Sequence, residues 1–175
     1  SSIILQNCRL YTNNVTFENN SDSSEGAAIY SSGSDYISTN DKFINNYAQN
    51  GAAIYGYNSI LDINNSKFIN DNKITWSLIY AYSSITKVNN TVFANLTSKY
   101  ATAIYCEMNS LMVSNSQFIN LSAENTAGAI GVKKTNAVSI DNCSFINVTS
   151  SKNGGAVYGD LNGNKYNSSN IVTIT

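Results

Sequence analysis

A repeat of about 25 residues runs through the chain and constrains its fold more than any other feature. Two markers keep this period independently. The first is a phenylalanine, at Phe17, Phe43, Phe68, Phe93, Phe118 and Phe145, with successive spacings of 26, 25, 25, 25 and 27. The second is an aliphatic residue in phrases such as GAAIY, at Ile29, Ile54, Ile79, Ile104, Ile130 and Val157. Six copies with one period indicate units that stack on their neighbours.

The intervals between the two markers are typical of short strands. The interval from each aliphatic marker to the next phenylalanine is longer than the interval from that phenylalanine to the following aliphatic marker, and both keep an almost constant length in every copy. Apolar residues alternate within the longer interval, as in Leu61 with Ile63 and Leu111 with Val113, which favours strands over helices. The sequence predicts an all-β, single-stranded parallel β-helix, a solenoid with about 25 residues per coil and roughly six to seven coils. A loop at 159–170 is expected to bulge from the last coil.

Stacked coils place equivalent residues above one another, so the repeat predicts columns of side chains. The six phenylalanines and the six aliphatic markers are expected to form two core columns, because no coil can bury its apolar face alone. One asparagine column lies three positions before the phenylalanines, at Asn14, Asn40, Asn65, Asn90, Asn115 and Asn142. Another lies two positions after them, at Asn19, Asn45, Asn70, Asn95, Asn120 and Asn147.

The asparagine columns suit the corners of each coil. Asparagine tolerates the left-handed conformation that a corner requires, and its amide both donates and accepts hydrogen bonds. We expect structural ladders that bond one coil to the next. The alternative is a row of sugar- or calcium-binding amides, which is less favoured because binding sites seldom repeat so evenly.

Aromatic residues recur directly after the aliphatic markers, with tyrosine in five of the six copies. Side chains alternate between the faces of a strand, so these tyrosines point outwards if the markers point inwards. Trp76 replaces a glycine found in neighbouring coils and has the same parity. The expected aromatic band consists of Trp76, Tyr55, Tyr57, Tyr80, Tyr82 and Tyr105. It suits glycans or protein partners, although a tyrosine ladder that only stabilises the sheet is the favoured alternative, and reversed parity would bury the tyrosines.

Composition narrows the range of partners and cofactors. The net charge is −1 and the chain has no basic patch, so no nucleic-acid partner is expected. No apolar run is long enough for a membrane span in this segment. The chain has no histidine, and its three cysteines, Cys8, Cys106 and Cys143, show no CxxC spacing. We therefore expect no metal and no cofactor, and interpret the cysteines as small buried apolar residues with an open disulfide status.

The two repeated phrases resemble those of known surface proteins. Paired GGA(I/L/V) and FxxN phrases mark the repeats of chlamydial polymorphic outer membrane proteins, and similar repeats fill adhesin-like surface proteins of methanogenic archaea. Residues 154–157 match GGAV without a substitution, and FxxN occurs at Phe17 with Asn20 and at Phe43 with Asn46. The amino-acid sequence has no proline and is rich in asparagine, isoleucine and tyrosine, which makes it more similar to the archaeal group. The resemblance implies a right-handed parallel β-helix on a cell surface with an adhesin role, and carries over no binding residues.

These features lead to one expected function and two alternatives. We expect residues 1–175 to be a single β-helix segment of a longer extracellular surface protein, next to other domains of that protein. Its expected role is a rigid adhesin stalk able to present a binding face to glycans or proteins of other cells. A purely structural spacer is one alternative.

The second alternative is a polysaccharide lyase or hydrolase of the parallel β-helix type. Such chemistry needs clustered carboxylates, whereas the acids here are scattered, with Asp62 and Asp141 expected in one column three coils apart. Arg9 is the sole arginine. The chain contains no histidine, which is the commonest general base. No nucleophile has a supporting base, so we assign no catalytic residue and expect no enzymatic activity.

Overall fold

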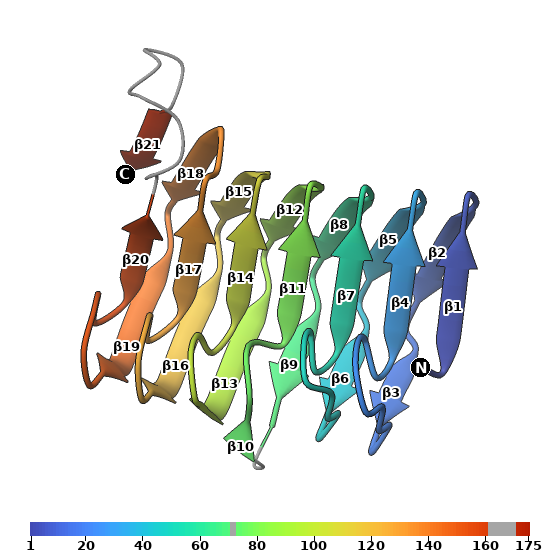
Figure 1. Cartoon of the computed structure of the whole chain (residues 1–175), viewed down its shortest axis with the longest axis horizontal. Coiled ribbons are helices and arrows are strands. Elements are labelled where there is room, and N and C mark those ends of the chain that lie inside the picture. The colour runs from blue at the N-terminus through green and yellow to red at the C-terminus, as the bar shows by residue number, and fades with distance from the viewer. Residues whose placement is uncertain (71–72, 161–170) are drawn as a thin grey trace.

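The computed structural model describes residues 1–70, 73–160 and 171–175, and these form β-strands and their connections. The strands build a stack of coils with three strands per coil (Figure 1). Most of the loop expected at 159–170 lies outside the described residues, and its first two residues, Gly159 and Asp160, belong to a strand instead. The prediction of an all-β solenoid with one coil per sequence repeat is confirmed, and the stack contains about six coils.

Three parallel sheets run the length of the stack. Sheet A consists of β1 (Ile3–Gln6), β4 (Ile29–Ser32), β7 (Ile54–Tyr57), β11 (Ile79–Tyr82), β14 (Ile104–Glu107), β17 (Ile130–Lys133) and β20 (Val157–Asp160). Sheet B consists of β2 (Arg9–Asn13), β5 (Asp35–Thr39), β8 (Ile60–Asn64), β12 (Ile85–Asn89), β15 (Ser110–Ser114), β18 (Ala137–Asp141) and β21 (Ile171–Ile174). Sheet C consists of β3 (Thr16–Glu18), β6 (Lys42–Ile44), β9 (Lys67–Ile69), β13 (Val92–Ser98), β16 (Gln117–Ala123) and β19 (Ser144–Ser150), and the short β10 (Lys73–Ile74) pairs with the end of β13.

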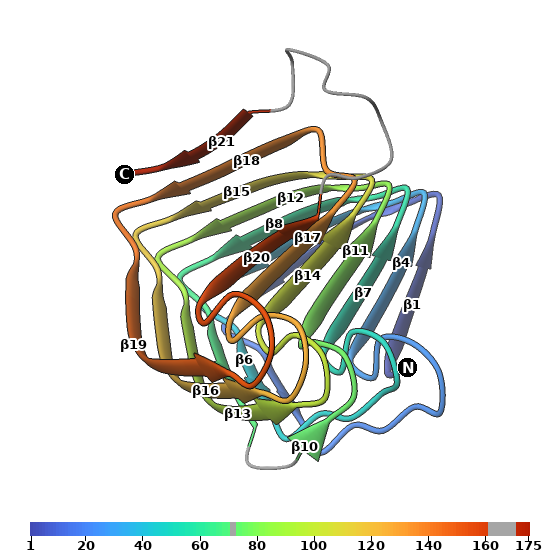
Figure 2. The ribbon, with the colours of Figure 1, turned by 60° about the vertical axis from the view of Figure 1, so that its left-hand side comes forward.

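The coil direction is visible in the end-on view of Figure 2. With the C-terminal coils towards the viewer, the chain runs up through sheet A, across sheet B, down and back along sheet C, and advances towards the viewer as it turns anticlockwise. This is a right-handed parallel β-helix, as the resemblance implied.

The two predicted core columns are confirmed. The six phenylalanine rings stack in sequence along sheet C, with neighbouring centroids 4.5–5.1 Å apart. The aliphatic markers from Ile29 to Ile130 are all fully buried, and the two final members, Phe145 and Val157, are partly buried. Each such side chain contributes about 1.5–3 kcal/mol when buried, so the columns form the main core.

The asparagine columns occupy corners, as predicted, but most of their side chains lie in solvent. Eleven of the twelve have a left-handed backbone with φ between 48° and 60°. Asn70 is the exception, and its side chain is fully buried. Four amides donate within the columns: Asn90 to Asn65, Asn142 to Asn115, Asn120 to Asn95 and Asn147 to Asn120, at 2.8–3.3 Å. Two others cross to an adjacent position, Asn40 to Asn13 and Asn115 to Asn89. The ladders are thus real but interrupted and exposed.

A second kind of polar ladder lies buried directly behind the corners. At the corner between sheets B and C, the backbone N–H of Ser66 donates to Thr91 Oγ1 (3.3 Å) and that of Thr91 to Ser116 Oγ (3.1 Å). Each hydroxyl also donates to the carbonyl two positions earlier. Ser34, Ser59 and Ser84 repeat the arrangement at the corner between sheets A and B. These hydroxyls satisfy backbone groups that would otherwise be buried without partners.

Candidate functional site

The aromatic band predicted from the sequence lies on the outer face of sheet A. Ile54, Ile79 and Ile104 point into the core, and the tyrosines that follow them point the other way. Tyr55 stacks on Tyr80 with ring centroids 5.6 Å apart, and Tyr80 lies 5.2 Å from Tyr105. The outward parity inferred from the alternation is therefore correct.

Trp76 gathers the centre of the band into one cluster. Its ring stacks on Tyr100 at 4.2 Å, meets Tyr105 at 5.1 Å and approaches Tyr80 edge-on at 5.9 Å. Tyr100 was missed from the sequence, because the column it belongs to has no other aromatic residue. The signal that could have found it is its position directly before the alanine that matches Trp76 in the next coil.

A tryptophan fits at position 76 because the turn there differs from the turn in the first coils. Gly26 and Gly51, its equivalents, have φ of 56° and 57°, and a Cβ on either would lie 2.2 Å from the carbonyl oxygen three positions later. Only glycine suits that turn. At residue 76 the chain follows a different path, in which the backbone of Tyr100 and Ala101 donates to the carbonyls of Thr75 and Trp76.

The band is less accessible than the sequence suggested. Tyr55 and Tyr105 are only 9% and 6% exposed, since the connections that lead into sheet A cover them; Ala101 and Ala127 pack on Tyr105. Burial raises the pKa of Tyr80 to about 12, and also raises the pKa of both Tyr55 and Tyr105. An outward direction thus does not mean exposure here, and two of the six expected contact residues cannot present a ring face to a large ligand.

Tyr57 and Tyr82 form a more accessible pair at the end of their strands. Their rings stack at 5.9 Å, and Tyr57 is 40% exposed. The exposed side chains of Ile60 and Ile85 begin the adjoining strands of sheet B, directly opposite each other. The most accessible apolar surface of the band is therefore this edge between sheets A and B, in the middle coils.

Some charged side chains form isolated ion pairs on the surface. Arg9 binds Asp35 through Nε (2.9 Å) and Nη2 (2.6 Å), Lys73 pairs with Glu124, and Lys133 with Glu107 (3.4 Å). The expectation that Asp62 and Asp141 share a column is wrong: Asp62 opposes Lys87, whereas Asp141 opposes Ser114. The column of Asp62 continues through Lys87 and Met112 to Ser139, two positions before Asp141, so the two acids lie in different columns.

Among the described residues, one carboxylate is buried, in the second coil. Asp41 is 1% exposed and accepts hydrogen bonds from the Val15 N–H (2.8 Å), from Ser38 Oγ (2.7 Å) and from Thr12 Oγ1. It occupies a position in the buried hydroxyl ladder, next to Ser66, whose Oγ accepts from the Asp41 N–H. Because this carboxylate is enclosed and its oxygens are occupied, it completes the ladder and is closed to a substrate.

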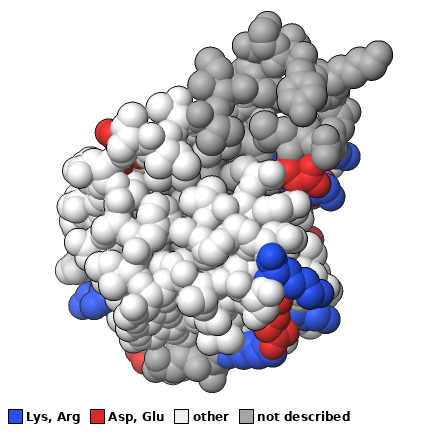
Figure 3. All heavy atoms as spheres, turned by 90° about the vertical axis from the view of Figure 1, so that its left-hand side faces the viewer, with Lys and Arg blue, Asp and Glu red and all other residues white. Residues whose placement is uncertain are grey.

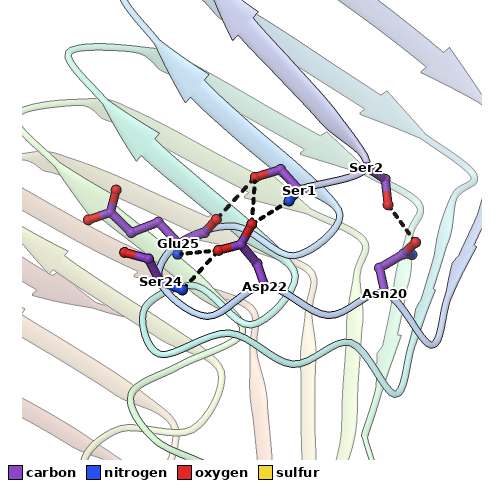
Figure 4. Close-up of polar contacts among 6 residues, drawn as sticks. All are labelled: Ser1, Ser2, Asn20, Asp22, Ser24 and Glu25. Carbon is purple, nitrogen blue, oxygen red and sulfur yellow. Dashed lines mark hydrogen bonds and ion pairs between the residues drawn. The ribbon is translucent and has the colours of Figure 1, made fainter.

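The two ends of the stack differ in their surface chemistry. At the first coil, Asp22 accepts hydrogen bonds from the N–H groups of Ser24 and Glu25 and from the amino group of Ser1 (Figure 4). At the last coil the described surface is largely uncharged (Figure 3), and the final members of the core columns, Phe145 and Val157, are only partly buried there. The core columns are thus less covered at this end.

Potential metal ligands and cysteines are scattered over the described residues. Within 1–70, 73–160 and 171–175, no three His, Cys, Asp or Glu side chains are placed to hold a metal ion. In the same ranges, no helix could cross a membrane. The cysteines are free thiols: Cys106 is buried, as expected, but Cys8 is exposed and Cys143 half-buried. Both occupy the corner hydroxyl columns, Cys8 in the first coil and Cys143 in the last, where a coil covers the column on one side only.

The fold and its ladders define a repetitive right-handed β-solenoid. A repeat model described as the Chlamydia polymorphic membrane protein repeat matches residues 14–32. This segment runs from the first corner asparagine, through Phe17 and Gly26, into β4, and the solenoid fits a β-helix built from repeats of this type. Comparisons with curated proteins and with solved structures gave no match.

Proposed function

We propose that this chain is a rigid stalk segment of an extracellular cell-surface adhesin, of the archaeal adhesin-like kind, without enzymatic activity of its own. The observation that carries the proposal is the unbroken register of sheets A, B and C along the stack. The strands of each sheet pair only with those of the preceding and following coils, so the solenoid acts as a stiff rod. The repeat match at residues 14–32, to a family described as membrane proteins, supports a surface location.

The rod also offers a binding face. We assign this role to the Trp76 cluster together with the Tyr57–Tyr82 pair, because aromatic rings with polar tips suit glycans and protein surfaces. The expected partners are glycans or proteins of other cells, and neighbouring domains of the same protein continue the stalk. Tyr55 and Tyr105 support the cluster from below and do not contact the partner.

The test is binding of the purified chain to intact cells and to a glycan panel. We expect Tyr57→Ala with Tyr82→Ala, and separately Trp76→Ala, to weaken binding by about tenfold or more, as for other central aromatic contacts. Tyr11→Ala is the matched control, since Tyr11 is 65% exposed on sheet B, outside the band. Melting curves separate lost binding from lost folding in Trp76→Ala.

Each outcome decides between the candidate roles. Absence of binding by the unmodified chain would leave the spacer role alone. Unchanged binding by both aromatic variants would show that the binding site lies outside the Trp76 cluster and the Tyr57–Tyr82 pair. Release of products from polysaccharides incubated with the chain and a divalent metal would overturn the non-enzymatic role.

A further inference from the structure

The outer face of sheet C carries a hollow in which two lysines meet two isoleucines. Lys42 pairs directly with Lys67 across β6 and β9, and Ile44 pairs with Ile69 beside them. These four residues line a hollow of about 230 Å³. Both lysines are exposed and both isoleucines are half-buried. The hollow therefore has an apolar floor and a cationic rim.

The two cations have no anionic partner in the part of the chain that the structure describes. Directly opposed like charges on neighbouring strands repel each other, and coils are about 4.8 Å apart. The ion pairs of the described residues engage Arg9, Lys73 and Lys133, not Lys42 or Lys67. Glu18 is the adjoining acid, opposite Ile44 in β3, and it forms no ion pair with either lysine. The rim is thus open to an external anion.

The surface beyond the hollow is straight and uncharged. The column of Lys67 continues through Val92 to Gln117, and the column of Ile69 continues through Ala94 to Ile119. These outward positions extend the floor along the solenoid axis for two further coils, about 10 Å at the usual strand spacing. A linear ligand that lies along this axis meets cations at one end and an apolar, neutral track after them.

We propose that this track binds a linear acidic polysaccharide. Carboxylates on neighbouring sugar units bind Lys42 and Lys67 through charge-assisted hydrogen bonds, and the C–H faces of the sugar rings lie on Ile44, Ile69 and Ala94. A uronic acid unit combines these two features, a carboxylate on its rim and an apolar ring face. An acidic peptide carries its charges on mobile, hydrated side chains and has no apolar face to cover the isoleucines. The site lies on a different sheet from the Trp76 cluster and does not depend on the proposed function.

The experiment measures the affinity of the chain for a labelled tetramer of uronic acid and for its neutral methyl ester. We expect the ester to bind about tenfold more weakly or worse, because a hydrogen bond to a charged group contributes roughly 1.5–3 kcal/mol and about 1.4 kcal/mol is a factor of ten. The double variant Lys42→Gln with Lys67→Gln should lose a similar factor. Binding of the acid form should also weaken as salt is added, since exposed charges are screened.

Matched controls keep the assignment falsifiable. Lys87→Gln with Lys134→Gln removes the same charge from other surfaces, a strand of sheet B and the turn after β17, and should leave affinity within about twofold, because neither side chain lies on sheet C. Equal losses in the two double variants would overturn the site. Equal binding of the acid and its ester would overturn the role of charge. Equal binding of polyglutamate would overturn the choice of a polysaccharide.

Discussion

Sheet C is built in two ways along the same molecule, and the difference is set at one position per coil. The first three strands, β3, β6 and β9, span three residues each, whereas β13, β16 and β19 span seven (Figure 1). In the first two coils the third residue after the phenylalanine is Asn20 or Asn46, and in the long strands it is Leu96, Leu121 or Val148. An apolar residue at this point carries the strand on over the core, and an asparagine ends it.

The first two short strands, β3 and β6, end in a polar cap. Asn46 is 1% exposed, donates from Nδ2 to the Phe17 carbonyl (2.9 Å) and accepts at Oδ1 from the backbone and side chain of Asn20 (3.1 and 2.8 Å). In the long strands Leu96 and Leu121 pair directly and are both 1% exposed. The same position in the coil thus holds either a hydrogen-bonded amide or an aliphatic side chain. With the amide the strand ends there, and with the aliphatic side chain the following residues continue the strand.

The largest effect is expected from moving the amide into a long strand. Leu121→Asn should lower the free energy of unfolding by about 3 kcal/mol or more, because it removes a fully buried aliphatic side chain and buries an amide without the partners that Asn46 has. Urea unfolding followed by far-ultraviolet circular dichroism measures it. Leu121→Met is the control, with an expected cost below about 1.5 kcal/mol. Equal stability of the two variants would show that the surrounding coils can build the cap anywhere.

The next effect concerns the turn that leads from sheet C back to sheet A. Gly51→Ala should cost about 1–3 kcal/mol, because alanine at φ 57° is strained and its Cβ would lie 2.2 Å from the Ile54 carbonyl oxygen. Ala101, at the equivalent place in the coil after Trp76, is the comparison, and Ala101→Gly should cost about 1 kcal/mol or less. Thermal unfolding of both variants provides the measurement. A Gly51→Ala protein as stable as the unmodified chain would mean that the first turn can adopt the later path.

The regular parts of this molecule were predictable from the sequence, and the irregular parts were not. Phe17 to Phe145 and Ile29 to Val157 could be assigned because apolar columns repeat in every coil, and left-handed asparagines followed from corner geometry. The buried ladder of Ser66, Thr91 and Ser116 was not anticipated, since serine and threonine are common everywhere in the chain. The burial of Tyr55 and Tyr105 depends on the path of the connecting segments, which periodicity does not determine.

A smaller effect, in the stabilising direction, is expected near the end of a long strand. Ser98 is fully buried beside Ile74 and Ala123, and within the described residues its hydroxyl has no hydrogen-bond partner. Ser98→Ala should raise the free energy of unfolding by about 1 kcal/mol, because a buried hydroxyl without a partner is costly. Ser66→Ala, in the satisfied ladder, should act in the opposite direction by a similar amount. Parallel urea titrations compare the two, and a destabilised Ser98→Ala protein would contradict the assignment.

The subtlest test uses pH to probe the covered tyrosines of sheet A. Burial raises the pKa of Tyr80 to about 12, and also raises the pKa of Tyr55 and Tyr105, whereas an unfolded chain releases these protons near pH 10. Above that pH the folded chain holds more protons than the unfolded one, so the stability from these neutral phenols, complete below pH 10, is lost as pH rises towards 12. Unfolding midpoints between pH 8 and 11.5 should be flat at first and then decline. Tyr80→Phe should make the decline shallower; equal slopes in the two proteins would show that the connections do not cover Tyr80 in solution.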